Sequence, residues 1–134
     1  MSKNLPELES LSPNLIVADV NRSVDFYTGK LGFTKIASVP DTGKLDWAMV
    51  TRGPVTVMFQ NIGSIQADVP QLKLSGGAAA ATFYIKVKGL SAWHEVVKAH
   101  VPIALPMRKT FYGANEFAIN DSDGNVLMFA EDAP

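Results

Sequence analysis

The sequence repeats itself at a spacing of 70 residues, and this repeat constrains the fold more than any other feature. Identities are few, but apolar positions of one half fall without a gap on apolar positions of the other: Leu15 on Ile85, Val17 on Val87, Trp47 and Ala48 on Phe117 and Ala118, and Val57, Met58 and Phe59 on Leu127, Met128 and Phe129. A coincidence between two strand-rich stretches would not give one offset for three strands and a helix. We therefore interpret the chain as two copies of one structural unit.

Each half predicts a strand, a helix and then three strands. The alternation around Leu15 is typical of a strand, and the helical spacing of Val24, Tyr27 and Leu31 is typical of an amphipathic helix. Asp19 or Asn21 is expected to cap that helix, and Gly32 to end it in the left-handed conformation. The expected elements are strand 12–18, helix 20–30 and strands 34–39, 46–51 and 55–60, then strand 81–87, helix 90–99 and strands near 103, 116–120 and 126–130.

The two halves form a single domain, because 134 residues leave little for a second one. We place repeat one at about 11–60 and repeat two at about 81–131. The linker 61–80 contains Gly63, Pro70 and a Ser-Gly-Gly run, and is interpreted as a loop. Residues 1–10 are interpreted as a loose arm. The fold class predicted for the domain 1–134 is α+β, with two βαβββ repeats.

Composition excludes several classes of function. There is no cysteine, so neither disulfides nor thiol redox chemistry are available. A net charge of −1 argues against a nucleic-acid partner and against binding to a membrane surface, since both need a basic face. Nowhere do 18 apolar residues run together, and the N-terminus has no apolar run typical of a signal peptide. A cytoplasmic protein is the default expectation.

Three segments carry a family resemblance: SPNLIVADVNRSVDFYTGKLGF, WAMVTRGPVTVMFQ and YGANEFAINDSDGNVLMFAE. They resemble the vicinal-oxygen-chelate superfamily of glyoxalases, bleomycin-resistance proteins and extradiol dioxygenases, from about Leu11 to Glu131. The resemblance implies that each βαβββ unit supplies a curved mixed sheet, and that paired units wrap a cup with the helices outside. Such a fold hosts many activities, so it does not fix the function.

The resemblance also implies where a metal would be held. Metal-dependent members use His or Gln and Glu on the first and fourth strands of each unit, and the matching positions here are Ser12, Met58, Thr82 and Met128. Thioethers and neutral hydroxyls are poor ligands for the divalent ions concerned. His94 and His100 are six residues apart, too far for a helical ligand pair, and are interpreted as solvent-facing. We expect no metal and no cofactor.

Alternation along the strands separates two faces. One face is expected to meet the helices and contains Leu15, Val17, Val57, Phe59, Phe83, Ile85, Val87, Leu127 and Phe129. The other contains Ser12, Asn14, Thr56, Met58, Gln60, Thr82, Tyr84, Lys86, Val126 and Met128, and its mixture of apolar and hydrogen-bonding groups suits a pocket for an organic molecule. The predicted ligand-binding residues are Asn14, Trp47, Met58, Gln60, Thr82, Tyr84, Tyr112, Glu116 and Met128.

Several of these assignments keep an alternative. The two methionines line the pocket or simply fill the space of a lost metal, and Trp47 stacks on a planar ligand or packs in the core. Trp93 is assigned to helix packing. Tyr112 is expected on a long loop after the sixth strand, where binding groups concentrate.

Catalytic candidates are few, because the chain has neither a nucleophile elbow nor a phosphate-binding loop. Glu116 is a weak candidate for a general base, on condition that desolvation raises its pKa. Lys86 and Glu116 pair with each other inside the cup or meet a charged ligand.

The opening Ser12-Pro13-Asn14-Leu15 and the hairpin from Trp47 to Phe59 most resemble the bleomycin-resistance type. That resemblance implies a metal-free protein that sequesters an antibiotic or toxin-like small organic molecule, as a homodimer that exchanges its N-terminal arm. Bleomycin is cationic and its binders tend to be acidic, so at a net charge of −1 another flat aromatic or hydrophobic compound fits as well. The alternative is a glyoxalase- or dioxygenase-like enzyme (lyase, isomerase or oxygenase) with an atypical or absent metal site, and a third is a regulatory binding module.

Overall fold

The computed structural model describes residues 5–7, 9–70 and 81–134, which form two four-stranded sheets and three helices. In chain order the elements are β1 (Asn14–Val17), α1 (Val20–Leu31), β2 (Thr34–Val39), β3 (Trp47–Arg52), β4 (Val55–Asn61), α2 (Ile62–Asp68), β5 (Thr82–Lys86), α3 (Leu90–Lys98), β6 (Leu105–Lys109), β7 (Ala114–Asn120) and β8 (Val126–Asp132). The strand orders are β1-β4-β3-β2 and β5-β8-β7-β6. In each sheet the first pair is parallel and the others are antiparallel, so the two βαβββ repeats of mixed sheet are confirmed.

The offset of 70 holds for the first and fourth strands of the repeat but not for the third. Asn14 pairs with Met58, and Tyr84 pairs with Met128, at the same offset. In the third strand, however, Trp47 pairs with Gln60 whereas Glu116 pairs with Ala130. The structural counterpart of Trp47 is therefore Glu116, at an offset of 69, and its alignment with Phe117 was wrong. The hairpin from β7 to β8 is longer by one residue.

Helix α1 begins and ends as expected. The Asp19 side chain accepts a hydrogen bond from the Arg22 amide at 3.1 Å and so caps the helix. Gly32 ends the helix at φ 77°, and its amide donates to the Tyr27 carbonyl. The buried stripe of α1 comprises Val20, Ser23, Val24, Tyr27 and Leu31.

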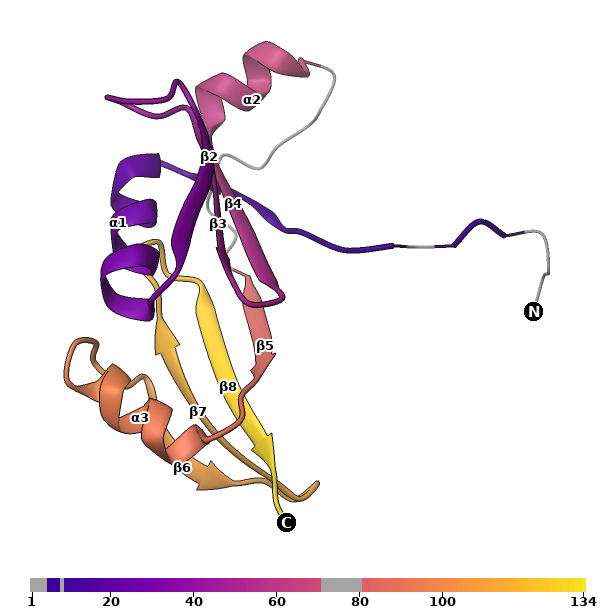
Figure 1. Cartoon of the computed structure of the whole chain (residues 1–134), viewed down its shortest axis with the longest axis vertical. Helices are drawn as coiled ribbons and strands as arrows, with labels where there is room; N and C mark the ends of the chain where they lie inside the picture. The colour runs from indigo at the N-terminus through magenta and orange to yellow at the C-terminus, as the bar shows by residue number, and fades with distance from the viewer. Residues whose placement is uncertain (1–4, 8, 71–80) are drawn as a thin grey trace.

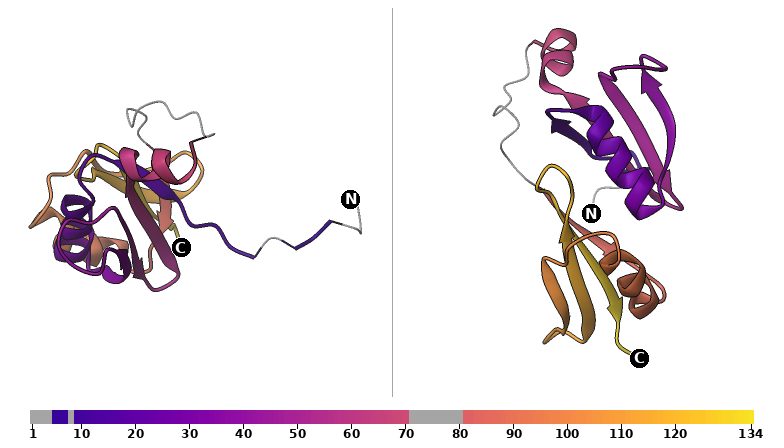
Figure 2. Two further views of the ribbon diagram at one scale, coloured as in Figure 1. Left: turned by 90° about the horizontal axis from the view of Figure 1, so that it is seen from above. Right: turned by 90° about the vertical axis from the view of Figure 1, so that its left-hand side faces the viewer.

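Both α1 and α3 lie on the same side of the two sheets (Figures 1 and 2). One hydrophobic core spans both units between these helices and the sheets. Every residue assigned to the helix-facing side of the strands belongs to this core or packs against it, which confirms that part of the prediction: Val17, Val57, Phe59, Leu127 and Phe129 are in the core, and Leu15, Phe83, Ile85 and Val87 pack against it.

The two units are also joined by polar contacts between α1 and the turn 121–125 of the second repeat. The hydroxyl of Tyr27 donates to Asp121 at 2.9 Å, and Arg22 forms an ion pair with Asp123 at 3.1 Å. Ser23 donates a further hydrogen bond to Asp123. The longer β7–β8 turn thus docks the second unit on the helix of the first.

Four expectations about local structure need correction. Part of the linker is the helix α2, capped by Asn61, whereas residues 71–80 lie outside the described residues. The sixth strand starts at Leu105 rather than near 103, and the connection after it is the short turn 110–113 rather than a long loop. His94 is not solvent-facing, because its ring packs edge-on against Phe117 at 4.8 Å.

Among the described residues, no helix is long and apolar enough to cross a membrane.

Candidate functional site

The face of the two sheets opposite α1 and α3 is called the open face here. Cross-strand partners share a face, so the pairing registers assign its members. On the first sheet these are Asn14, Ile16, Trp47, Met49, Thr51, Thr56, Met58 and Gln60. On the second they are Thr82, Tyr84, Lys86, Leu105, Arg108, Glu116, Ala118, Asn120, Val126, Met128 and Ala130. The face that Trp47 and Glu116 occupy, which alternation left open, is thereby settled.

Amide groups order the open face of the first sheet. The Asn14 side chain donates to Gln60 Oε1 at 2.9 Å, and the Gln60 amide nitrogen donates to Ser64 Oγ of α2 at 3.0 Å. Trp47 is the cross-strand partner of Gln60, and Met58 is the partner of Asn14. Four of the predicted binding residues therefore lie together, with an indole and a thioether beside two oriented amides.

The open face of the second sheet centres on Tyr84, whose ring is 51% exposed although it lies mid-strand. Its partner across the strands is Met128, and Thr82 pairs with Val126 two positions away. An exposed tyrosine beside a half-buried methionine offers a binding surface that is apolar in its body and polar at its tip. Three predicted residues are brought together here.

Glu116 is the one buried carboxylate of the open face, with 1% of its surface exposed. Its Oε1 accepts from the Tyr112 hydroxyl at 2.7 Å, and its Oε2 accepts from Arg108 Nε and Nη2 at 3.0 and 2.7 Å. These hydrogen bonds, that of Tyr112 first and those of Arg108 second, lower the pKa of Glu116. A general base would need the opposite shift, so the condition attached to that role is not met.

Lys86 does not pair with Glu116. Its Nζ lies 3.0 Å from Asp132 Oδ2, and Arg108 takes the place that the sequence analysis offered to Lys86. Arg108 and Met49 are among the members of this face that sequence reasoning missed. Arg108 precedes Glu116 by eight residues across a hairpin, but a β-bulge between Leu105 and Arg108 obscures the register.

The residues at the family's metal positions do not fit a metal. Met58 and Met128 lie on the open face, as predicted, but supply thioethers, and Ser12 and Thr82 supply neutral hydroxyls. Divalent ions of this family need imidazole and carboxylate donors. Within residues 5–7, 9–70 and 81–134, no three His, Cys, Asp or Glu side chains gather as a metal ion would require.

A cavity of about 500 Å³ opens beside β5, where the first sheet meets the second. Thr56, Thr82 and Tyr84 line it from the open face, and Leu11 and Pro13 line it from the chain segment before β1. Its volume lies within the range of about 300–1,000 Å³ that small-molecule sites occupy. Two of the predicted binding residues therefore line a space of suitable size.

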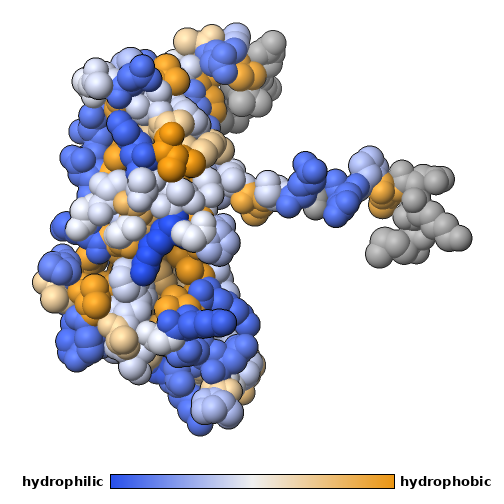
Figure 3. Space-filling model, viewed as in Figure 1, coloured by the Kyte–Doolittle hydropathy of each residue, from blue (hydrophilic) through white to orange (hydrophobic). Residues whose placement is uncertain are grey.

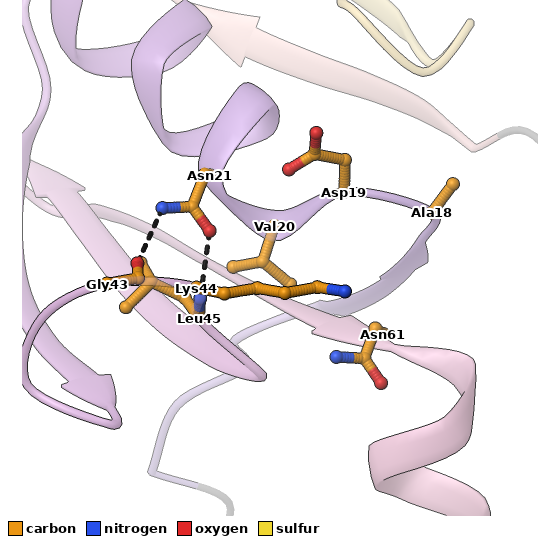
Figure 4. A pocket seen from close by; sticks show the side chains of 8 residues that line it. All are labelled: Ala18, Asp19, Val20, Asn21, Gly43, Lys44, Leu45 and Asn61. Atoms are coloured by element: carbon orange, nitrogen blue, oxygen red, sulfur yellow. Dashed lines mark hydrogen bonds between the residues drawn. The ribbon is translucent and has the colours of Figure 1, made fainter.

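Figure 4 shows a smaller, polar pocket at the end of β1, of about 380 Å³. Asn21 binds the loop 43–45 there, donating at 2.9 Å and accepting at 2.8 Å. Asp19 and Asn61 cap helices with their side chains. Lys44 extends along the pocket. Because its amide and carboxylate groups already hold the local fold, this pocket is structural.

The predicted binding residues thus form two groups, one on each sheet. Both lie on the open face, and Tyr112 joins the second group through Glu116 although it lies in the turn after β6. Within the described residues, no side-chain hydrogen bond or ion pair joins the group of Trp47 to that of Tyr84.

Comparisons with known proteins agree with this architecture. A family model described as "Glyoxalase/Bleomycin resistance protein/Dioxygenase superfamily" matches residues 10–129. No curated protein matches the chain.

Three solved structures share the fold. TioX from Micromonospora sp. ML1 is 19% identical with a TM-score of 0.78, over 92% of this chain and 98% of that one. A glyoxalase/bleomycin resistance protein/dioxygenase from Nocardioides is 17% identical with a TM-score of 0.76, over 97% and 87%. A lactoylglutathione lyase from Agrobacterium tumefaciens is 17% identical with a TM-score of 0.74, over 94% and 95%.

Proposed function

Because the chain belongs to the glyoxalase/bleomycin resistance protein/dioxygenase superfamily, we propose that it binds and sequesters a small organic molecule on the open face without a metal. The molecule is flat, largely apolar and antibiotic- or toxin-like, as for the bleomycin-resistance type that the sequence most resembles. The proposed place of action is the cytoplasm.

The observation that carries this proposal is the chemistry of the open face. Trp47, Met58, Tyr84 and Met128 present aromatic rings and thioethers there, and Asn14 adds an oriented amide. Aromatic and thioether groups adapt to planar ligands, and a few fixed polar groups orient them. The metal positions favour binding over the usual chemistry of the family, because they lack suitable donors.

We propose further that the working form is a homodimer. Tyr84, Val39 and Phe111 are 51%, 57% and 101% exposed, so both units present large apolar side chains that a partner could cover. The described residues before β1, 5–7 and 9–13, extend away from the body on the side opposite α1 and α3 (Figures 1 and 3), and Leu5 and Leu11 among them are 69% and 91% exposed. A second copy that receives this arm would cover apolar surface on both chains.

A ligand screen by thermal shift tests the binding proposal. A ligand that binds only the folded state at 100 times its Kd stabilises it by about 2.7 kcal/mol. We expect some flat aromatic compounds to raise the Tm of the wild type and of Val96→Ala, but not of Tyr84→Ala. Val96 and Tyr84 are equally exposed, at 51%, and Val96 lies on α3 away from the open face, so the pair is matched. Equal responses in both variants would contradict the proposal.

Elemental analysis separates sequestration from the enzymatic alternative. Protein purified without chelator and then exposed to nickel, zinc, manganese and iron should retain far less than one equivalent of each. A stoichiometric metal would refute the metal-free proposal and favour a glyoxalase- or dioxygenase-like enzyme. Sedimentation analysis of the full chain, with and without residues 1–10, tests the exchange of the arm.

A further inference from the structure

A second cavity lies at the seam between the two units, where core-facing side chains and the open-face residue Lys86 line it. Its volume is about 380 Å³, and it is bounded by the tip of the β3–β4 hairpin, by β5 and by α3. The aromatic rings of Phe33, Trp93 and Phe129 line it. This space, called the seam cavity, is large enough for a ligand of one or two rings.

The charged residues of the seam cavity all have the same sign. Arg52, Lys86 and Lys88 line it, and no acidic residue does so within the described part of the chain. Asp132 already neutralises Lys86 at 3.0 Å, so the excess positive charge comes from Arg52 and Lys88.

Arg52 is held in place by both units. Its guanidinium carbon lies 4.4 Å from the centroid of the Trp93 ring, and its Nη1 donates to the Leu31 carbonyl at 3.3 Å. A guanidinium carries five N–H donors in a rigid fork, so this single hydrogen bond leaves donors for a ligand. A positioned arginine beside aromatic rings is suited to a planar anion.

The ring of Trp93 lines the seam cavity, whereas its Nε1 atom is enclosed by the surrounding protein. This nitrogen donates no hydrogen bond to any of the described residues. A buried donor without an acceptor is costly, and indole N–H groups in protein interiors usually have one. The ring, not this donor, therefore faces the seam cavity.

We propose that the seam cavity, which shares Lys86 and four further lining residues with the cavity of about 500 Å³, binds a small aromatic carboxylate. The ring of the ligand lies among Phe33, Trp93 and Phe129, and its carboxylate accepts hydrogen bonds from Arg52 and Lys88. Because Arg52 belongs to the first unit and Lys88 to the second, the bound anion bridges the two repeats.

The two tryptophans allow each site to be observed separately. Trp47 lies on the open face and Trp93 in the seam cavity, so a ¹⁵N-labelled sample gives one indole N–H signal for each, assigned with Trp47→Phe. We would titrate the full chain with phenylacetate and with its neutral isostere phenylacetamide. The expected result is a saturable shift of the Trp93 signal with phenylacetate alone, in the millimolar range expected of so small a ligand.

Two variants and a control test the charges. Arg52→Met should weaken phenylacetate about tenfold or more, since a charge-assisted hydrogen bond is lost. Lys35→Met removes an equal charge from the exposed strand β2 and should change nothing. If Arg52→Met does not fold, Lys88→Met, on an exposed side chain outside the helices and strands, replaces it.

Three outcomes would overturn the proposal: no shift of the Trp93 signal, equal shifts with acid and amide, or an unchanged affinity in Lys88→Met and Arg52→Met. A shift of the Trp47 signal alone would also overturn it, while supporting binding at the open face. Failure of the thermal-shift screen would refute the proposed function and leave this site untouched.

Discussion

The hydrogen bond between Tyr27 and Asp121 connects the two repeats, and the stability lost on its removal can be calculated from the structure. The hydroxyl donates at 2.9 Å to a carboxylate that is 6% exposed, and burial together with the charge of Asp121 raises the pKa of Tyr27. Tyr27→Phe leaves the ring in place and removes one donor from a buried charge. Hydrogen bonds to charged groups contribute about 1.5–3 kcal/mol.

The expected change in Tm follows from the size of the chain. About 2.1 cal/mol/K per residue gives 134 residues an unfolding entropy of about 0.28 kcal/mol/K, so the Tm should fall by about 5–11 °C. Differential scanning calorimetry measures it, and Tyr84→Phe, which loses a hydroxyl from an exposed side chain, should leave it unchanged. A fall below about 2 °C would refute the reasoning, because Asp121 would then be satisfied by its other donors alone.

Two further predictions concern Glu116 and the end of α1. The pKa of Glu116 is lowered from the usual 4.5 by Tyr112 and Arg108, so its stabilising contribution is present above that value and is lost as the pH falls through the folded pKa. In thermal melts from pH 7 to pH 3, Glu116→Gln should be less stable than the wild type at pH 7, and the difference should shrink towards pH 3. Gly32→Ala should destabilise by about 1–2 kcal/mol in urea titrations, because φ is 77°. The control Gly29→Ala lies inside α1 with open space around it, and should be neutral or stabilising.

The repeat could be detected in the sequence because core positions of both halves must be apolar, even where the two halves use different apolar residues. The spacing of Leu15, Val57 and Phe59 and of their counterparts placed the strands and the core face correctly. Helix α2 was not predicted because it has only seven residues and none of them is buried, so its sequence lacks the apolar stripe that indicates a helix. Its only signal was Asn61 ahead of Ser64, whose amide the asparagine side chain caps at 2.7 Å.

His94 had a signal that was overlooked. Leu90, His94 and Val97 follow the i, i+4, i+7 spacing of one helix face, and Leu90 and Val97 are buried. A histidine within such a stripe faces the sheet, and here it packs against Phe117. The rejection of His94 as a metal ligand rested on its spacing from His100, which this correction leaves unchanged.

The alternation of apolar and polar residues could not show on which face of the sheet Glu116 lies, and the reason is physical. β7 lies between β8 and β6, and four consecutive residues from Glu116 to Ile119 are buried, so apolar and polar positions do not alternate along it. Its partner Arg108 depends on the register of β6, which a bulge shifts. Side-chain pairs across irregular strands cannot be derived from the spacing of residues along the chain.

One extra residue in the β7–β8 hairpin explains both the contact between the two units and the position of Glu116. It gives the turn 121–125 the length to dock on α1, and it also shifts β7 so that Glu116 takes the place that Trp47 has in the first repeat. The two sheets therefore differ at equivalent positions of the open face, an indole on one and a neutralised carboxylate on the other. Under the proposed function, a ligand that spans both sheets meets the Trp47 ring on one side and the exposed Arg108 and Tyr112 side chains, which Glu116 holds in place, on the other. The chain's departure from its own repeat would then determine which ligand it selects.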